Sequence, residues 1–353
     1  MREVAKQRFV HLDFLRFVAI ALVFLMHLGL DKYIPGGAGV TIFFVISGFI
    51  ISYLNLKQGK KETFDIKEFA LKRAFKIFPP LFLLVLLPGF IYMKWHPEAT
   101  SQFIGQVFFY YNSYRSVENA LVLPGTGVVW SLSIEEQFYV AFPIFLALVW
   151  TSKHRNRWIF SLSVIAIAMS TSYRVFNYVN FADPQWLNYF STLARIDSIA
   201  FGVALGVLYS EPRTRAWLDA ISLRSWRFSG LLATLVFATS SMIAIPMFAN
   251  IFLHTVQSVC AAIVIAYGLF EVNESRVLKF MNFAPFQLLG RISYPFYLVH
   301  FTVILSLKAA LDTFSPLLAI CLAFPISFTI ALLTHKWIEI PSLKLRDRLL
   351  REN

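Results

Sequence analysis

Residues 12–29, "LDFLRFVAIALVFLMHLG", decide the class of fold to which this chain belongs. The run is apolar and long enough to cross a bilayer as a helix, yet it contains Asp13, Arg16 and His27. Each ionisable group inside a span costs about 2.5–3.5 kcal/mol on insertion scales, so such groups usually face the interior of a helix bundle. Because Asp13 and Arg16 interrupt the run and no small-residue cleavage site follows, we expect a retained first span rather than a signal peptide.

The composition extends this interpretation to the whole chain. Of its 353 residues, 58% are hydrophobic and only 15% are charged, which is too few polar residues to cover a soluble protein of this size. Apolar runs of about 18 or more residues recur along the length and predict an all-α integral membrane protein with about ten transmembrane helices. The expected spans are 13–30, 40–56, 77–94, 131–151, 157–178, 190–209, 228–246, 249–270, 286–312 and 316–338.

The basic residues predict the orientation of these spans. The net charge of +12 is carried mainly by short loops between the spans, so we expect the lipid bilayer as a partner and no nucleic acid. Twenty-four of the 32 lysine and arginine residues lie on the side of the two termini, and three (Lys32, Lys94 and Arg115) lie in the opposite loops. The positive-inside rule therefore places both termini in the cytoplasm.

No feature of the sequence divides the chain into parts. There is no linker rich in Pro, Gly or Ser, no low-complexity tract and no evident repeat, so residues 1–353 are expected to form a single membrane domain. The segment "FIGQVFFYY" (103–111) is too short to cross a bilayer and is expected to be re-entrant or interfacial.

Arg16 and His27 are the first candidate site residues. They are 11 positions apart, about three helical turns, so both project from one face at a separation of roughly 16 Å along the axis. The two side chains cannot touch but can line one groove. The alternative is that Arg16 extends to the inner headgroups and His27 hydrogen-bonds to a neighbouring helix.

Two further motifs carry charge at the ends of spans. In "KRAFKIFPP", Arg73 and Lys76 lie one turn apart and can hold anionic phosphates, although the positive-inside rule predicts basic loops in any case. In "WSLSIEEQFYVAFP", the adjacent Glu135 and Glu136 point to different faces of a helix. At least one of them should therefore meet a cavity or the aqueous boundary, unless both serve as acidic residues near a helix start.

Two later spans also contain polar residues. In "ARIDSIAFGVALG", Arg195 and Asp197 precede a stripe of small residues and are expected either to pair with other helices or to contact a ligand. In "ISYPFYLVH", Tyr297 and His300 lie on one face of a helix. Such groups often only join helices, but His300 adds a second imidazole deep in the bundle.

Together these motifs are similar to those of the acyltransferase-3 family of bacterial membrane acyltransferases, which typically O-acetylate surface sugars. The resemblance runs through the whole chain and implies a multi-pass protein of the bacterial cytoplasmic membrane. Some members carry an extra hydrolase-like domain outside the membrane, which we do not expect here. The motifs that carry the resemblance, in order, are "LDFLRFVAIALVFLMH", "GVTIFFVISGFIISY", "KRAFKIFPP", "WSLSIEEQFYVAFP", "FGVALG" after the Arg-x-Asp, "ISYPFYLVH" and "WIEIPSL".

The resemblance also implies roles for several residues. Arg16 and His27 match the functional arginine and histidine of the first helix. Arg73 matches the first of a pair of arginines, while lysine replaces the second at position 76, keeping the charge but losing the bidentate fork. The conserved family glutamate maps best to Glu135, with Glu136 second. No metal and no permanently bound cofactor is implied.

From these roles we formulate a mechanism. Acetyl-CoA or another acyl-CoA is the expected co-substrate, with Arg16, Arg73 and Lys76 at its phosphates and its thioester beside His27. His27 then acts as general base on an acceptor hydroxyl or becomes acylated, and Glu135 or Glu136 orients it. Further candidates for acceptor binding or oxyanion stabilisation are Tyr297, His300, Arg195 and Asp197.

The sequence leaves other points open. A transporter or flippase would also place Arg, Glu and His in a bundle core, although no inverted repeat or pair of broken helices is evident. A non-catalytic lipid-binding or scaffold protein would not require the spacing of Arg16 and His27. Lipopolysaccharide, exopolysaccharide, a glycan precursor and a small glycoside all fit as the carbohydrate acceptor.

Overall fold

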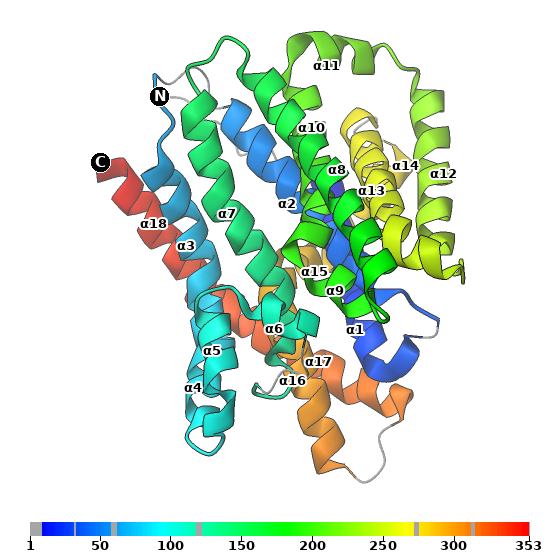
Figure 1. Cartoon of the computed structure of the whole chain (residues 1–353). Coiled ribbons are helices and arrows are strands. Elements are labelled where there is room, and N and C mark those ends of the chain that lie inside the picture. The colour runs from blue at the N-terminus through cyan, green and yellow to red at the C-terminus, as the bar shows by residue number, and fades with distance from the viewer. Residues whose placement is uncertain are drawn as a thin grey trace.

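A computed structural model describes residues 9–31, 33–57, 62–117, 122–271, 275–311 and 315–352. Within these ranges the chain is helical and forms no strand, and its long helices run beside one another as a bundle (Figure 1). The predicted all-α membrane class is thereby confirmed. The orientation of the termini remains a prediction from charge, and Lys32, which entered that count, lies outside the described residues.

The first part of the described chain contains α1 (Val10–Leu25), η1 (Met26–Leu30), α2 (Gly36–Lys57), α3 (Ile66–Leu81), η2 (Phe82–Leu86), α4 (Leu87–Met93), η3 (Pro97–Ala99), α5 (Thr100–Val107), α6 (Tyr111–Val117), η4 (Thr126–Val129), α7 (Trp130–Val149), α8 (Arg155–Asn180) and α9 (Gln185–Phe190). The second part contains α10 (Thr192–Ser210), α11 (Pro212–Asp219), α12 (Leu223–Ser240), η5 (Phe248–Phe252), α13 (Leu253–Phe270), α14 (Arg276–Met281), α15 (Ala284–Arg291), α16 (Ser293–Ala310), α17 (Pro316–Thr334), η6 (His335–Glu339) and α18 (Ile340–Glu352).

The number of membrane spans is slightly lower than expected. In the described part of the chain, eight helices are long and apolar enough to cross a membrane, and α15 with α16, bent by 78°, would make nine. The difference lies at the expected span 228–246, which falls on α12. This helix has 18 residues and begins with Arg224 and Arg227 in its first turns, so its composition is too polar, although it packs along α13.

Close contact between α2 and α10 forms the centre of the bundle. A Cβ atom added at Gly48 would lie 2.0 Å from the carbonyl oxygen of Ile199, and one added at Gly202 would lie 2.1 Å from that of Val45. Only glycine permits the two backbones to approach so closely, as expected for small residues at membrane helix interfaces. The small-residue stripe of the sequence is therefore confirmed as a packing surface.

π-helical turns interrupt several of the long helices. One of them, η1, contains His27 and, near its end, Gly29, whose φ of 90° lies in the left-handed region that glycine tolerates. Another, η6, contains His335 and Glu339, and η5 contains Asn250. Such turns hold one surplus residue and frequently occur at functional sites, because they turn side chains away from the regular helical direction.

Candidate active site

A cavity of about 610 Å³ lies among α1, α2, α3, α7, α16 and η6. We call it the basic cavity because four cationic side chains line it. Three of them, Arg16, Arg73 and Lys76, are the residues expected to bind an acyl donor, and the fold brings them together. The fourth, Arg291, lies at the bend between α15 and α16 and was not singled out from the sequence.

Two of these cations already have carboxylate partners. Arg16 Nη1 lies 3.0 Å from Oδ1 of Asp13, three positions earlier on α1. Lys76 forms a close ion pair with Glu339, whose side chain is 1% exposed. The buried carboxylate of Glu339 therefore offsets the charge of Lys76, whose expected role in donor binding stays a prediction.

The other two cations are available to an anionic ligand. The guanidinium of Arg73 lies 5.3 Å from the centre of the Tyr139 ring and has no carboxylate partner within the described ranges. Arg291 likewise forms no ion pair with any described residue. Because an arginine can bind a phosphate through two parallel hydrogen bonds, both side chains suit an anionic ligand.

The adjacent glutamates of α7 point in different directions, as expected. Glu135 lines the basic cavity and accepts hydrogen bonds from Ser47 Oγ at 3.2 Å and from the Tyr139 hydroxyl at 2.9 Å. Glu136 lines neither this cavity nor that of His27, and its buried Oε1 has no hydrogen-bond partner among the described residues. The expected contact of a glutamate with His27 is not formed, because His27 faces a different cavity.

That second cavity has a volume of about 490 Å³ and we call it the histidine cavity. It is lined mainly by apolar and aromatic side chains, including Trp130 and Tyr189, which is typical of sites for organic ligands. Tyr111 lies in its wall on the short helix α6. Burial raises the pKa of Tyr111 to about 12, against the opposing effect of Arg115, so its phenol remains a hydrogen-bond donor at neutral pH.

A chain of hydrogen bonds fixes the imidazole of His27. The Nδ1 atom of His300 lies 2.8 Å from the carbonyl oxygen of Tyr297, which can only accept, so this nitrogen carries the proton. The Nε2 atom of the neutral His300 then accepts from Nδ1 of His27 at 3.0 Å. By this assignment Nε2 of His27 keeps its lone pair, which is the form that a general base or nucleophile requires.

The two cavities are neighbours that share two residues, Val40 and Tyr297. The hydroxyl of Tyr297 donates to the carbonyl oxygen of Val128 at 2.9 Å and lies 2.8 Å from the hydroxyl of Ser131. We expected Arg16 and His27 to line one continuous groove. The structure places Arg16 in the basic cavity and His27 in the neighbouring histidine cavity, and Tyr297 lines both.

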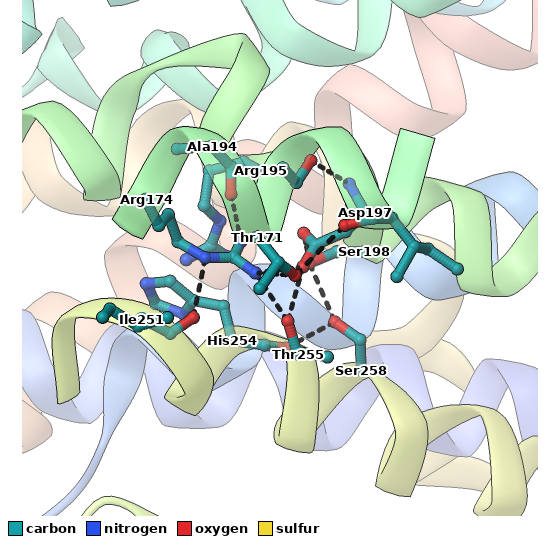
Figure 2. Close-up of polar contacts among 12 residues, drawn as sticks. Thr171, Arg174, Ala194, Arg195, Asp197, Ser198, Ile251, His254, Thr255 and Ser258 are labelled. Atoms are coloured by element: carbon teal, nitrogen blue, oxygen red, sulfur yellow. Dashed lines mark hydrogen bonds and ion pairs between the residues drawn. The ribbon is translucent and has the colours of Figure 1, made fainter. Parts of the chain in front are cut away.

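Arg195 and Asp197 lie outside both cavities. Asp197 forms an ion pair of 2.8 Å with Arg174, and both side chains are fully buried (Figure 2). Of the two alternatives left by the sequence, pairing between helices is the one that holds for Asp197. Arg195 donates to the Thr41 hydroxyl at 2.9 Å and stands 5.5 Å from the Tyr189 ring, and its Nε and Nη1 have no partner in the described structure.

Sequence reasoning missed three residues that shape the site. Arg174 occurs within an expected span, the same signal that drew attention to Arg16. Glu339 lies inside the motif "WIEIPSL", and Arg291 lies just before "ISYPFYLVH". Attention to every charged residue inside an expected span would have found Arg174 and Arg291, whereas Glu339 lies just after the last expected span.

Comparison with known proteins agrees with the resemblance seen in the motifs. The model of the acyltransferase-3 family, described as an acyltransferase domain, matches residues 9–336. Among curated proteins, the peptidoglycan O-acetyltransferase OatA of Listeria monocytogenes is 26% identical over 346 residues, which cover 94% of this chain and 55% of the relative. A putative O-acetyltransferase of Staphylococcus aureus strain COL is 26% identical, covering 96% of this chain and 58% of its own length.

The O-acetyltransferase OatA of Staphylococcus aureus strain NCTC 8325 is 23% identical and is covered over 57% of its length. This chain thus spans little more than half the length of the curated relatives that it matches. No solved structure matches it.

Proposed function

Because this chain belongs to the acyltransferase-3 family, we propose that it is a membrane O-acetyltransferase of the bacterial cytoplasmic membrane. Its donor is acetyl-CoA or another acyl-CoA, and its acceptor is a hydroxyl of a cell-surface or lipid-linked carbohydrate. The O-acetyltransferase names of the relatives support the acetyl group. The observation that supports the proposal most directly is that a basic cavity and a histidine cavity are neighbours and share Val40 and Tyr297.

The basic cavity suits the anionic part of the donor. Its phosphates would pair with Arg73 and Arg291, with Arg16 nearby, at the side that the charge count assigns to the cytoplasm. The uncharged arm of the donor would extend along the cavity towards Tyr297. A thioester at the Tyr297 end of the basic cavity would lie next to the histidine cavity.

The histidine cavity supplies the chemistry. Nε2 of His27 takes the proton from the acceptor hydroxyl as the hydroxyl oxygen attacks the thioester carbonyl, and the C–S bond breaks. The proton then passes to the departing thiolate, which leaves as the free thiol of CoA. In the alternative route, Nε2 itself attacks the thioester carbonyl, the C–S bond breaks and CoA leaves as the thiolate, so that the acyl group is bound to the imidazole. The acceptor hydroxyl then attacks this acyl group, the C–N bond breaks, and the hydroxyl proton passes to the thiolate.

The acceptor enters from the opposite side of the bundle in this proposal. The name of the Listeria relative makes peptidoglycan the first acceptor to examine. Aromatic side chains of the histidine cavity, among them Trp130 and Trp186, offer flat apolar faces that suit the C–H face of a sugar ring.

A transfer assay with the purified protein in lipid nanodiscs tests this function. With labelled acetyl-CoA and soluble peptidoglycan fragments, we expect label in the carbohydrate, and a rate at least about 100-fold lower for His27→Ala. His11→Gln is the matched control, because His11 is a buried histidine on the same helix and lines neither cavity.

Equal rates for the wild type and His27→Ala would contradict the assignment of His27. Failure of the wild type to consume any acyl-CoA, with a range of acceptors, would contradict the acyltransferase function itself and favour a transporter. Acyl-enzyme that accumulates before acceptor is added would identify the covalent route, and a purely acceptor-dependent release of CoA would identify direct transfer.

A further inference from the structure

A third cavity, of about 250 Å³, adjoins the histidine cavity. It lies between α9, η5, α13 and the start of α2, and it shares Gly37 and Tyr189 with the histidine cavity. We call it the amide pocket, because side-chain amides from three of these elements and a hydroxyl line it. Its polar and aromatic lining residues are Gln185, Asn188, Tyr189, Ser241, Asn250, His254 and Gln257.

The lining of the amide pocket contains no Asp, Glu, Lys or Arg. This distinguishes it from the basic cavity, whose ligand must be anionic. Amide and hydroxyl groups offer both donors and acceptors without charge, and the rings of Tyr189 and His254 lie 5.8 Å apart beside them. Such a lining fits a neutral ligand that carries several hydroxyl or amide groups.

Several buried polar atoms in this pocket lack a partner. The side chains of Gln257 and His254 are 1% and 7% exposed, and Gln257 Oε1 and His254 Nδ1 form no hydrogen bond with described residues. Gln257 donates from Nε2 to Ser241 Oγ at 3.0 Å, which fixes the amide. Oδ1 of Asn250 is also buried without a partner. Buried polar groups are nearly always satisfied, so these three atoms point to a bound ligand.

The wall of the amide pocket is held rigid from behind. Arg174 donates from Nε to the carbonyl oxygen of Ile251 at 2.8 Å, and its ion pair with Asp197 fixes the guanidinium (Figure 2). Asn188 Nδ2 donates to the carbonyl oxygen of Asn250 at 3.2 Å. The backbone of η5 is thus fixed at two successive carbonyls, so the pocket is preorganised.

From this geometry we propose that the amide pocket is a carbohydrate subsite, which binds the sugar unit next to the one that is acetylated. The proposal rests on the proposed function, because it takes the histidine cavity as the place of transfer. The amide pocket and the histidine cavity share Gly37 and Tyr189, so they lie next to each other, as two successive units of one glycan would require. The orphaned acceptors Gln257 Oε1 and Asn250 Oδ1 receive hydrogen bonds from its hydroxyl or amide groups.

The test is a binding measurement without acyl donor. Calorimetry on the protein in nanodiscs would compare soluble peptidoglycan fragments of one and of two disaccharides, in the wild type, Gln257→Met and Asn250→Ala. We expect the longer fragment to bind the wild type at least tenfold more tightly than the shorter one, and both variants to lose most of that difference. Asn180→Ala removes an amide from α8 that does not line the pocket and should keep the difference.

Acetyl-CoA affinity, measured in the same preparations, shows that each variant is folded. Equal affinity of the longer fragment for the wild type and both variants would overturn the subsite, and so would a wild type that turns over acetyl-CoA but binds both fragments equally. Carbohydrate binding that depends on Gln257, in a protein that never consumes acyl-CoA, would instead support the subsite and refute the proposed function. The two proposals can therefore fail separately.

Discussion

At the scale of single residues, the partner of His27 is unusual for an acyl-transfer site. In a Ser-His-Asp triad, a carboxylate orients the imidazole and stabilises its protonated form. Here the neighbour is His300, which sets the tautomer through the carbonyl of Tyr297 but brings no negative charge. The arrangement orients the base without stabilising its cation, so protonated His27 is expected to be short-lived and to pass its proton on quickly.

Removal of His300 tests this positioning role. In His300→Leu the Nδ1 proton of His27 loses its acceptor, and we expect kcat for transfer to fall by about 100-fold. His300→Gln keeps an acceptor at a similar place and should recover part of the loss. Steady-state measurements of kcat for the two variants test this role. A kcat of His300→Leu equal to that of the wild type would show that the contact between His27 and His300 has no catalytic importance.

The two basic residues of α3 that line the basic cavity, Arg73 and Lys76, are predicted to behave differently. Arg73→Gln should raise KM for acetyl-CoA by about tenfold or more with little effect on kcat, because a charge-assisted hydrogen bond contributes about 1.5–3 kcal/mol. Lys76→Met removes the lysine partner of the buried Glu339, which keeps only His335 Nδ1 at 3.1 Å, and should mainly lower the thermal unfolding midpoint. Lys72→Gln, on the same helix but outside the basic cavity, serves as the control. A KM unchanged in Arg73→Gln would remove this residue from donor binding.

At the scale of helices, the pair of Arg174 and Asp197 joins three elements. Arg174 belongs to α8 and Asp197 to α10, and the hydroxyl of Thr255 on α13 donates to the same carboxylate at 2.9 Å (Figure 2). A fully buried ion pair is costly to desolvate, so its value lies in fixing how these helices meet.

Replacing one partner of this ion pair should therefore strongly destabilise the fold. We expect Arg174→Met to destabilise the fold by about 3–5 kcal/mol, because Asp197 is left as an unpaired buried charge. The double variant Arg174→Met with Asp197→Leu should regain part of this stability. Unfolding in detergent, followed by circular dichroism, measures both, and a double variant less stable than Arg174→Met would contradict the explanation.

The sequence predicted helices better than it predicted their interruptions. Length and hydropathy place eight of the ten expected spans on described helices that qualify, and a ninth on the bent pair α15 and α16, because a bilayer demands a continuous apolar run. Regular periodicity cannot reveal the π-helical turn that holds His27, since one surplus residue leaves composition unchanged. Periodicity also cannot pair His27 with His300, which lies 273 positions later. The sequence therefore suggested Glu135 or Glu136 as the residue that orients His27.

At the scale of the whole molecule, three cavities form a row through the bundle. The basic cavity meets the histidine cavity at Tyr297, and the histidine cavity meets the amide pocket at Tyr189. Each boundary thus includes an aromatic side chain, which can turn about its χ angles without disturbing the backbone. The sequence indicated the residues of the first two cavities, but the walls depend on contacts between distant helices and could not be predicted.

The boundary at Tyr297 should keep water and acceptor from the donor until transfer. In Tyr297→Ala the basic and histidine cavities would merge, and hydrolysis of acetyl-CoA without acceptor should rise by about tenfold or more, since exclusion of water limits that side reaction. Tyr297→Phe keeps the ring and loses only the hydroxyl contacts, so it should remain close to the wild type. Release of free CoA in acceptor-free assays distinguishes them, and no increase in the alanine variant would refute the barrier.

The π-helical turn at Met26–Leu30 has a consequence for how this chain can change during evolution. One residue there is surplus to the regular helix, so the loss of one position would restore an ordinary α-helical turn and leave the packing of the preceding α1 intact. The imidazole, however, would then leave the helix in another direction, away from His300. A relative with a single-residue gap at this point would retain the bundle and lose the reaction, so the length of this short segment marks which homologues can share the chemistry.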